Sequence, residues 1–260
     1  LPFPYLATVT AIVVTPTPAQ EKSVWQFNQM DIKTVSTFLV FLNSENKACL
    51  GTLIHKQWVL TAAHCFLPQG DGSLGKFRKE LMESHKAKSF ESKMKNLPML
   101  TMQHPNFTWD SAEHDLMLIK LTHPLKLNDQ LKLVLLPTTT TDRRLDNCTV
   151  FGWGWAWRNI NNIKPDVKIN HTVFWFPDEY CQDSPIAKMP VKITENMFCA
   201  GSSLESIHSC KEIDAVPILC QNQLQGILSW SEGCIMRGDV GYYTKVSRYT
   251  DWILKVIHTY

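Results

Sequence analysis

The cysteines constrain this chain more than any other feature. Eight of them occur in 260 residues, at positions 49, 65, 148, 181, 199, 210, 220 and 234. An even count without a C-x-x-C pair disfavours zinc ribbons and thiol redox motifs, and it favours disulfide bonds. Disulfides form in oxidising compartments, so we expect a secreted, extracellular protein. The spacing alone does not say which cysteines pair with one another.

The first twenty residues differ in composition from the rest of the chain. Residues 6–14 form a short apolar run, and residues 15–19 include two prolines. This pattern predicts the end of a secretory signal peptide, with cleavage near Ala19, so residues 1–20 are assigned to a signal-peptide remnant or a disordered N-terminus. A buried first strand is the alternative. No later segment offers about 18 consecutive apolar residues, so no membrane span is expected.

Three Asn-x-Thr sequons agree with secretion. They begin at Asn106, Asn147 and Asn170. We expect glycans at Asn106 and Asn170. Asn147 is a poorer acceptor because a cysteine follows it directly.

The charge balance gives little sign of a polyanionic partner. The formal net charge is +2, so we expect no nucleic-acid partner and no strong electrostatic attraction to a membrane surface. One basic stretch begins at Lys76 and ends at Lys95, with seven lysines and arginines against three glutamates. A solvated surface loop is the first interpretation of this stretch, and a glycosaminoglycan-binding surface is the second.

Short apolar runs broken by turn residues predict an all-β protein. Two segments depart from this pattern. Residues 177–183 fit one short helix, and apolar residues at i, i+3, i+4, i+7 and i+8 from Tyr249 predict an amphipathic C-terminal helix capped by Ser247 or Thr250. The expected strands cover residues 35–42, 49–54, 58–62, 116–121, 148–153, 171–176, 218–219, 224–230 and 241–246.

Six motifs carry a family resemblance, which runs from about residue 35 to the C-terminus. They are TAAHC at 61–65, HDLMLIKL at 114–121, FGWG at 151–154, NMFCAG at 196–201, LQGILSW at 224–230 and GYYTKV at 241–246. In this order, and with matching cysteines, the chain resembles the trypsin/chymotrypsin family of serine proteases.

The resemblance implies two packed antiparallel six-stranded β-barrels with the active site in the cleft between them. The expected parts are an N-terminal barrel at 21–135, a C-terminal barrel at 136–245 and a C-terminal α-helix at 246–260, together forming one peptidase-like domain. The implied disulfides are Cys49–Cys65, Cys148–Cys220, Cys181–Cys199 and Cys210–Cys234.

The family's reaction needs a serine nucleophile, a histidine base and an aspartate that orients the histidine. By motif, His64 and Asp115 match the histidine and the aspartate. Within the frame set by the cysteines at 210 and 220, Asp214 falls on the serine and Glu212 on the glycine of the oxyanion hole. A carboxylate is a poor nucleophile toward an amide and has no proton for His64 to remove. A side chain at 212 also works against the oxyanion geometry.

Further departures from the family pattern concern activation and specificity. Ile213 replaces the aspartate that pairs with the new N-terminus, and no Gly-Gly follows Lys22. His208 stands at the base of the specificity pocket, where a trypsin has aspartate, and Ser231 replaces a glycine on the pocket wall. Together these departures predict an inactive homologue, not a working enzyme, with no cofactor.

Purely structural interpretations of these residues also stay open. His64 could serve packing and hydrogen bonding beside Cys65, or it could form an ion pair with Asp214. Two neighbouring carboxylates would favour a protonated His64. A metal site of His64, Asp115 and Asp214 lacks a further ligand, except for His208, so no metal is expected.

The leading hypothesis is a secreted, monomeric, inactive protease homologue that acts by binding an unidentified protein partner. It resembles the inactive trypsin-like paralogues of mammals, several of which are linked to testis and sperm, so the resemblance suggests a role in male reproduction. Residual or unusual hydrolase activity is one alternative, although Ser209 is a poor substitute nucleophile. A glycosaminoglycan-binding scaffold that uses the loop from Lys76 to Lys95 is the other.

Overall fold

The computed structural model describes most of the chain from residue 38 onward. The described residues are 38–43, 48–65, 98–108, 111–129, 131–140, 143–156, 167–182, 192–202, 210–231, 233–235 and 238–260. The predicted signal peptide, the basic loop from Lys76 to Lys95 and the pocket residue His208 lie outside these ranges. Among the described residues, no helix is long and apolar enough to cross a membrane.

The first sheet has five antiparallel strands in the described part of the chain. They are β1 (Leu39–Asn43), β2 (Ala48–His55), β3 (Trp58–Thr61), β4 (Pro98–Gln103) and β5 (Met117–Leu121), in the spatial order β1-β2-β3-β5-β4. All four residues of β3 and all but one of β5 are buried, so these central strands are covered on both faces.

The second sheet closes on itself. Its order is β10-β11-β12-β8-β7-β6-β9, and β10 also pairs with β6, which makes a closed barrel of six strands with β9 as an extension. The strands are β6 (Cys148–Ala156), β7 (Val167–Trp175), β8 (Met197–Gly201), β9 (Cys210–Glu212), β10 (Pro217–Cys220), β11 (Gln223–Ser231) and β12 (Gly241–Lys245).

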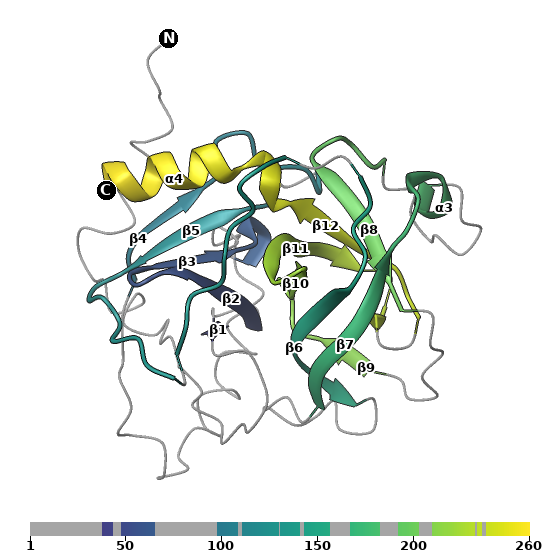
Figure 1. The fold of residues 1–260 in the computed structure, drawn as a ribbon, viewed down its shortest axis with the longest axis horizontal. Coiled ribbons are helices and arrows are strands. Elements are labelled where there is room, and N and C mark those ends of the chain that lie inside the picture. The colour runs from purple at the N-terminus through teal and green to yellow at the C-terminus, as the bar shows by residue number, and fades with distance from the viewer. Residues whose placement is uncertain are drawn as a thin grey trace, which may run out of the picture.

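Three short helical segments and one longer helix complete the described chain. The short ones are η2 (Ala63–Cys65), α3 (Asp178–Gln182) and η6 (Val246–Arg248). The longer helix α4 (Thr250–Thr259) crosses one end of the molecule above β4 and β5 (Figure 1). Its buried face packs Ile253 and Val256 into the core of the first sheet.

These elements confirm the all-β fold with two sheets and a C-terminal helix. The predicted helix caps were wrong: Tyr249 is the N-cap of α4 and makes no side-chain cap bond. Thr250 lies inside the helix, and its hydroxyl donates 3.2 Å to the carbonyl of Pro137. The Thr250 hydroxyl therefore makes a tertiary hydrogen bond and does not cap the helix.

The core of each sheet takes in residues from the other half of the chain. The core of the first sheet includes Ala215, Leu224 and Ile227, which come from the second half of the chain, while Leu50 of β2 belongs to the core of the second barrel. The backbone N–H of Leu50 donates 2.8 Å to the carbonyl of Asp214. The segment around residue 214 is therefore anchored where the sheets meet.

Disulfides join Cys49 to Cys65, Cys148 to Cys220 and Cys181 to Cys199, the pairs that the resemblance implied. Cys234 is also disulfide-bonded. The side chain of its expected partner, Cys210, lies outside the described residues. The three sequon asparagines, Asn106, Asn147 and Asn170, are exposed.

Candidate active site

His64 is placed by a short turn that follows a buried strand. It lies in η2, three residues after the end of β3, and neighbouring Cys65 is tied to β2 through its disulfide with Cys49. The hydroxyl of Thr61 donates 2.7 Å to the carbonyl of Leu50, which fastens the end of β3 to the same strand. The histidine therefore stands on a rigid support.

Asp115 lies just before β5 and is 2 % exposed. One carboxylate oxygen, Oδ1, accepts the backbone N–H of His64 at 2.9 Å. The other, Oδ2, lies 2.6 Å from Nδ1 of His64 and accepts the hydroxyl of Ser229 at 2.6 Å. Three donors around one buried carboxylate compensate for its loss of water.

This arrangement fixes the role of each nitrogen of the His64 ring. A carboxylate beside Nδ1 holds a proton there, so a neutral ring presents Nε2 as the acceptor. Nε2 is buried and has no hydrogen-bond partner among the described residues. The hydrogen bond from Nε2 that would accompany an ion pair with Asp214 is therefore not formed. The geometry is that of a histidine oriented for general-base work.

Ser229 is a site residue to which the sequence assigned no role. It lies on β11 of the second barrel, whereas His64 and Asp115 belong to the first half of the chain. Its hydroxyl is also 3.2 Å from the carbonyl of Ala112. The only available signal was its place inside the LQGILSW motif, which does not show where the hydroxyl points.

Asp214 is half-buried and sits in an isolated bridge with Cys49, next to Ala215, which has a φ of 62°. Glu212, expected at the oxyanion position, is 5 % exposed. Burial, and then the charge of Glu212, raise the pKa of Tyr243, which is a core residue of the second barrel. The Glu212 carboxylate thus lies close enough to act on the barrel interior.

Of the two predicted specificity-pocket residues, the structure describes only Ser231. Ser231 ends β11 and is half-buried, and its hydroxyl donates 3.0 Å to the carbonyl of Gly233. His208 lies outside the described residues. Among the described residues, His64, Asp115 and Asp214 do not form a group of side chains close enough together to hold a metal ion. The one cluster found there is Cys49, His64 and Cys65, whose two sulfurs are joined in a disulfide.

An aromatic and histidine cluster packs behind Asp115. The ring of His114 stacks on His104 at a centroid distance of 5.0 Å, and its Nδ1 lies 2.8 Å from the hydroxyl of Tyr249. Burial, and then the charge of His114, lower the pKa of His104 to about 4. This cluster ties α4 to the segment that carries Asp115.

Glu113 links the same segment to the second barrel. Its Oε1 accepts the amide of Asn196 at 2.7 Å and the hydroxyl of Thr194 at 2.8 Å. The hydrogen bond from Asn196 is the main reason that the pKa of Glu113 is lowered. The two residues that precede Asp115 are therefore themselves anchored to other parts of the chain.

The comparisons with known proteins agree with this geometry. The family described as Trypsin matches residues 27–253. The chain belongs to the trypsin family of serine proteases. It is 38 % identical to human serine protease 58 over 87 % of this chain and 89 % of that protein. It is 33 % identical to pig trypsin over 85 % of this chain and 90 % of that protein.

A solved structure gives the same result for the fold. Neuropsin, a serine protease expressed in the limbic system of mouse brain, superposes on this trypsin-family chain with a TM-score of 0.63 and 29 % sequence identity. The match covers 85 % of this chain and 94 % of neuropsin.

These relatives correct one prediction. The departures at 212–214 led us to expect that the chain is not an enzyme. The chain's family is that of the serine proteases, and its relatives carry the names trypsin and serine protease, so the prediction of inactivity is contradicted. The preserved pairing of His64 with Asp115 shows the physical reason: changes in the segment at 212–214 leave the base and its orienting carboxylate in place.

Proposed function

We propose that this trypsin-family chain is a secreted protein that binds a polypeptide segment at the site of His64. The observation that carries the proposal is the orientation of His64 by Asp115, with a buried Nε2 that lacks a partner. A buried polar atom without a hydrogen bond is costly, and in a native structure it calls for an explanation such as a functional role. A polar group of a bound segment would remove that cost.

The support for the site is consistent with this role. Asp115 receives donors from both halves of the chain. The two residues before it are anchored as well, one by Asn196 just before β8 and the other by Tyr249 at the N-cap of α4. A binding surface built on such fixed elements loses little conformational entropy when it captures a ligand.

The same geometry favours peptide-bond hydrolysis as a second candidate function. Nε2 of His64 is the acceptor that would take a proton from the nucleophile. Since Asp214 occupies the position matched to the family's serine, the nucleophile we propose is water. The water oxygen would bond to the scissile carbonyl carbon while one of its protons passes to Nε2. The C–N bond would then break as the protonated ring returns that proton to the leaving amine, and the water oxygen would stay in the new carboxyl group.

Both functions are tested with one set of fluorescently labelled peptides of varied sequence. Binding is measured by fluorescence anisotropy and cleavage by mass spectrometry, for the glycosylated protein and for a His64→Ala variant. His258→Ala, an exposed histidine on α4, is the matched control. We expect the His64 change to weaken binding, and any cleavage, at least about tenfold. Equal binding and cleavage by both variants would contradict the proposal.

The nucleophile is assigned separately with a serine-directed fluorophosphonate probe. Under the water mechanism, the folded protein is cleavage-competent without being labelled. Stoichiometric labelling would show that a serine hydroxyl carries the reaction and would exclude the water mechanism.

The role in male reproduction remains a proposal that rests on the sequence resemblance. Secretion is supported by the disulfides and by the exposed sequon asparagines Asn106 and Asn170. Detection of the glycosylated protein in reproductive-tract fluid, and its absence from other secretions, is the expected result. A protein retained inside cells would contradict it.

A further inference from the structure

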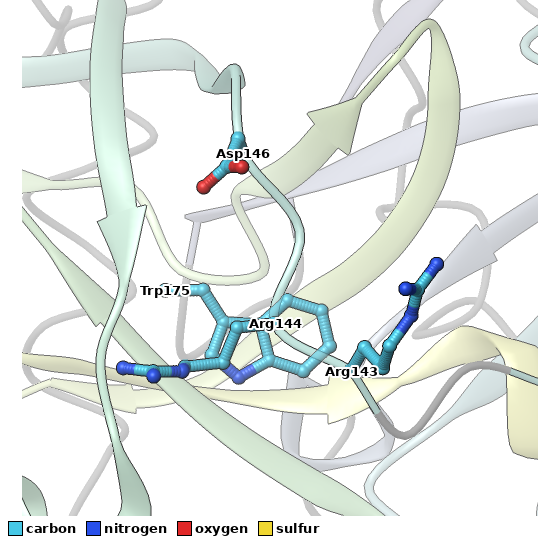
Figure 2. A pocket seen from close by; sticks show the side chains of 4 residues that line it. All are labelled: Arg143, Arg144, Asp146 and Trp175. Atoms are coloured by element: carbon cyan, nitrogen blue, oxygen red, sulfur yellow. The ribbon is translucent and has the colours of Figure 1, made fainter.

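A solvent-open hollow on the second barrel lies outside the residues of the active site. It is lined by Arg143, Arg144, Asp146 and Trp175 (Figure 2). The Trp175 ring is 8 % exposed with Phe198 stacked on it, and the two guanidinium groups extend to opposite sides of the ring. Charges of both signs beside a covered ring define no ligand. The histidine pair behind Asp115 is more definite, because its contacts act directly on a residue of the site.

His104 holds the residues on either side of Asp115. Its backbone N–H donates 2.9 Å to the carbonyl of Leu116, and its ring stacks on the ring of His114 at 5.0 Å between centroids. The N–H of Leu116 donates 2.7 Å to the carbonyl of His114, which closes a tight turn with Asp115 at its centre. The position of the Asp115 carboxylate therefore depends on His104, and one of the two contacts is the ring stack.

The backbone of His114 needs side-chain contacts to hold its conformation. Its φ is 56°, in the left-handed region that residues other than glycine enter at a cost. The stack on His104 fixes the ring, and Nδ1 of the ring lies 2.8 Å from the hydroxyl of Tyr249. Loss of the stack would let the backbone of His114 relax. That relaxation would displace Asp115, which is the next residue.

The stack is suited to a neutral ring at His104. Nδ1 of this ring accepts the backbone N–H of Asn106 at 3.3 Å, and a doubly protonated imidazole has no acceptor to offer. The rings of Tyr249 and Trp252 make T-shaped contacts with His104 and help to bury it. Burial, and then the charge of His114, lower the pKa of His104 to about 4. A proton on His104 therefore costs a hydrogen bond as well as the loss of water.

The charges near the pair act on its two rings unequally. The hydrogen bond from Asn196 is the main cause that lowers the pKa of Glu113, and the charges of His114 and Lys192 act in the same direction. A carboxylate therefore stands on the His114 side, whereas the charge that acts on His104, after burial, is the cationic one of His114. Further charged side chains on the surrounding elements are Arg248, Glu195 and Asp251.

We propose that the stacked pair of His104 and His114 is a latch that opens in acid and releases Asp115 from His64. A proton on His104 breaks the stack, the backbone of His114 relaxes, and the turn that holds the Asp115 carboxylate opens. His64 does not cause this opening, because a positive charge on its ring strengthens its contact with Asp115. As a control of ligand binding at His64 the latch rests on the proposed function, whereas the opening itself does not.

The difference in proton binding gives the opening a sign and a size. In the open arrangement His104 regains the ordinary histidine pKa of 6.5, whereas in the closed arrangement the pKa is about 4. Between these values the open arrangement binds the extra proton, so opening becomes easier as the pH falls from 6.5 to 4. The ratio of open to closed protein should rise roughly thirtyfold from pH 7.5 to pH 5.0.

Hydrogen exchange of the intact glycosylated protein, read at single amides and corrected for intrinsic rates, measures this opening at the two pH values. The amides to follow are that of Leu116, which donates to His114, and that of His64, which donates to Asp115. We expect the protection of both to fall roughly thirtyfold. At both pH values they should also be less protected than the slow amides of β12, since opening of the latch leaves the second barrel folded.

Two variants assign the effect to the pair. His104→Asn keeps an acceptor for Asn106 but has no ring to protonate, so its protection should change by less than about twofold. His114→Asn removes the charged neighbour with a residue that tolerates the left-handed backbone, and it should lose part of the pH dependence. His258→Asn, an exposed histidine on α4, is the matched control and should behave as the wild type.

Two results of the exchange experiment would overturn the latch. One is a pH dependence in His104→Asn equal to that of the wild type. The other is protection of the Leu116 and His64 amides equal to that of β12, because only global unfolding would then free His104.

Fluorescence anisotropy with the labelled peptides measures the consequence for binding. Between pH 7.5 and pH 5.0 the wild type should lose more affinity than His104→Asn. Equal losses in the two proteins would show that the latch does not control the site. Absence of binding at both pH values would contradict the proposed function, and the exchange result would then decide the latch by itself.

Discussion

At the scale of single residues, the site depends on how one buried carboxylate is satisfied. Asp115 accepts the backbone N–H of His64, lies against Nδ1 of the ring and accepts the hydroxyl of Ser229. Removing one donor leaves part of a buried charge without a partner, which costs more than an average hydrogen bond contributes. Ser229 therefore matters to stability as well as to the orientation of His64.

We expect Ser229→Ala to lower the free energy of unfolding by about 1–3 kcal/mol, measured by urea denaturation at neutral pH. Ser231→Ala on the same strand is the control, because its hydroxyl bonds only a loop carbonyl, that of Gly233. The control should lose about 1 kcal/mol or less. Equal losses in the two variants would mean that the bond to Asp115 contributes nothing special.

The histidine pair behind Asp115 gives a pH dependence with a definite sign. An unfolded histidine binds a proton below about pH 6.5, whereas burial lowers the pKa of folded His104 to about 4. Between these values the unfolded state carries the extra proton, so stability falls as the pH falls from 6.5 to 4 and His104 adds no further loss below that. His114, stacked on the ring, is the neighbouring charge that adds to this effect.

We expect His104→Asn to lose less stability than the wild type between pH 6.5 and pH 4.5, because asparagine keeps an acceptor but has no proton to bind. Urea midpoints at the two pH values measure the difference. His258→Asn, on the exposed face of α4, should keep the wild-type dependence. An unchanged slope in His104→Asn would show that the loss of stability comes from other groups.

The same residues show where prediction from sequence ends. His64 and Asp115 were found because each sits in a motif, and their contact follows from the family's fold. The contact of Ser229 with Asp115 and the effect of Glu212 on the pKa of Tyr243 were not predicted. The direction of a side chain on a twisted strand depends on packing across the barrel, which the sequence does not show. The expected consequence of Asp214 for activity was wrong, because a change at one position does not report on the base and carboxylate that remain.

At the scale of elements, apolar runs predicted nine of the strands but missed three others, of which β8 is fully buried. β4 begins at Pro98 and lies at the sheet edge, β8 was noted only as a motif, and β9 has three residues. β4 has a mixed pattern, and β8 and β9 are only five and three residues long, so each depends on its neighbours to complete its pairing. The pattern of apolar residues also could not predict that the second barrel closes, because closure requires β10 to pair with both β11 and β6.

A disulfide lies on that closing seam. Cys148 and Cys220 are register partners in the pairing of β6 with β10, and 72 residues separate them. Removing the bond by a double change to alanine should cost about 4 kcal/mol, because the unfolded chain regains the freedom of a long loop. The same change at Cys181 and Cys199, 18 residues apart, should cost about 3 kcal/mol. Urea denaturation ranks the two, and a larger loss for the shorter loop would contradict the entropic account.

At the scale of the whole molecule, the two sheets are joined by a shared core. Ala215, Leu224 and Ile227 pack with the first sheet, and α4, the last element of the chain, inserts Ile253 and Val256 into the same cluster. The site of His64 draws on both halves through Ser229. Neither half therefore buries its apolar surface alone, and the expected boundary near residue 135 divides the sequence more sharply than it divides the interior.

We therefore expect the two sheets to unfold together, which hydrogen exchange measured by mass spectrometry can test. Ile253 is fully buried, so Ile253→Ala should lower the free energy of global opening by about 2–5 kcal/mol. Because the core is shared, slow amides of β5 and of β12 should lose the same amount, although α4 packs on the first sheet. Leu254→Ala, 41 % exposed on the same helix, should change both by less than about 0.5 kcal/mol. Loss of protection in β5 alone would show two independently unfolding barrels.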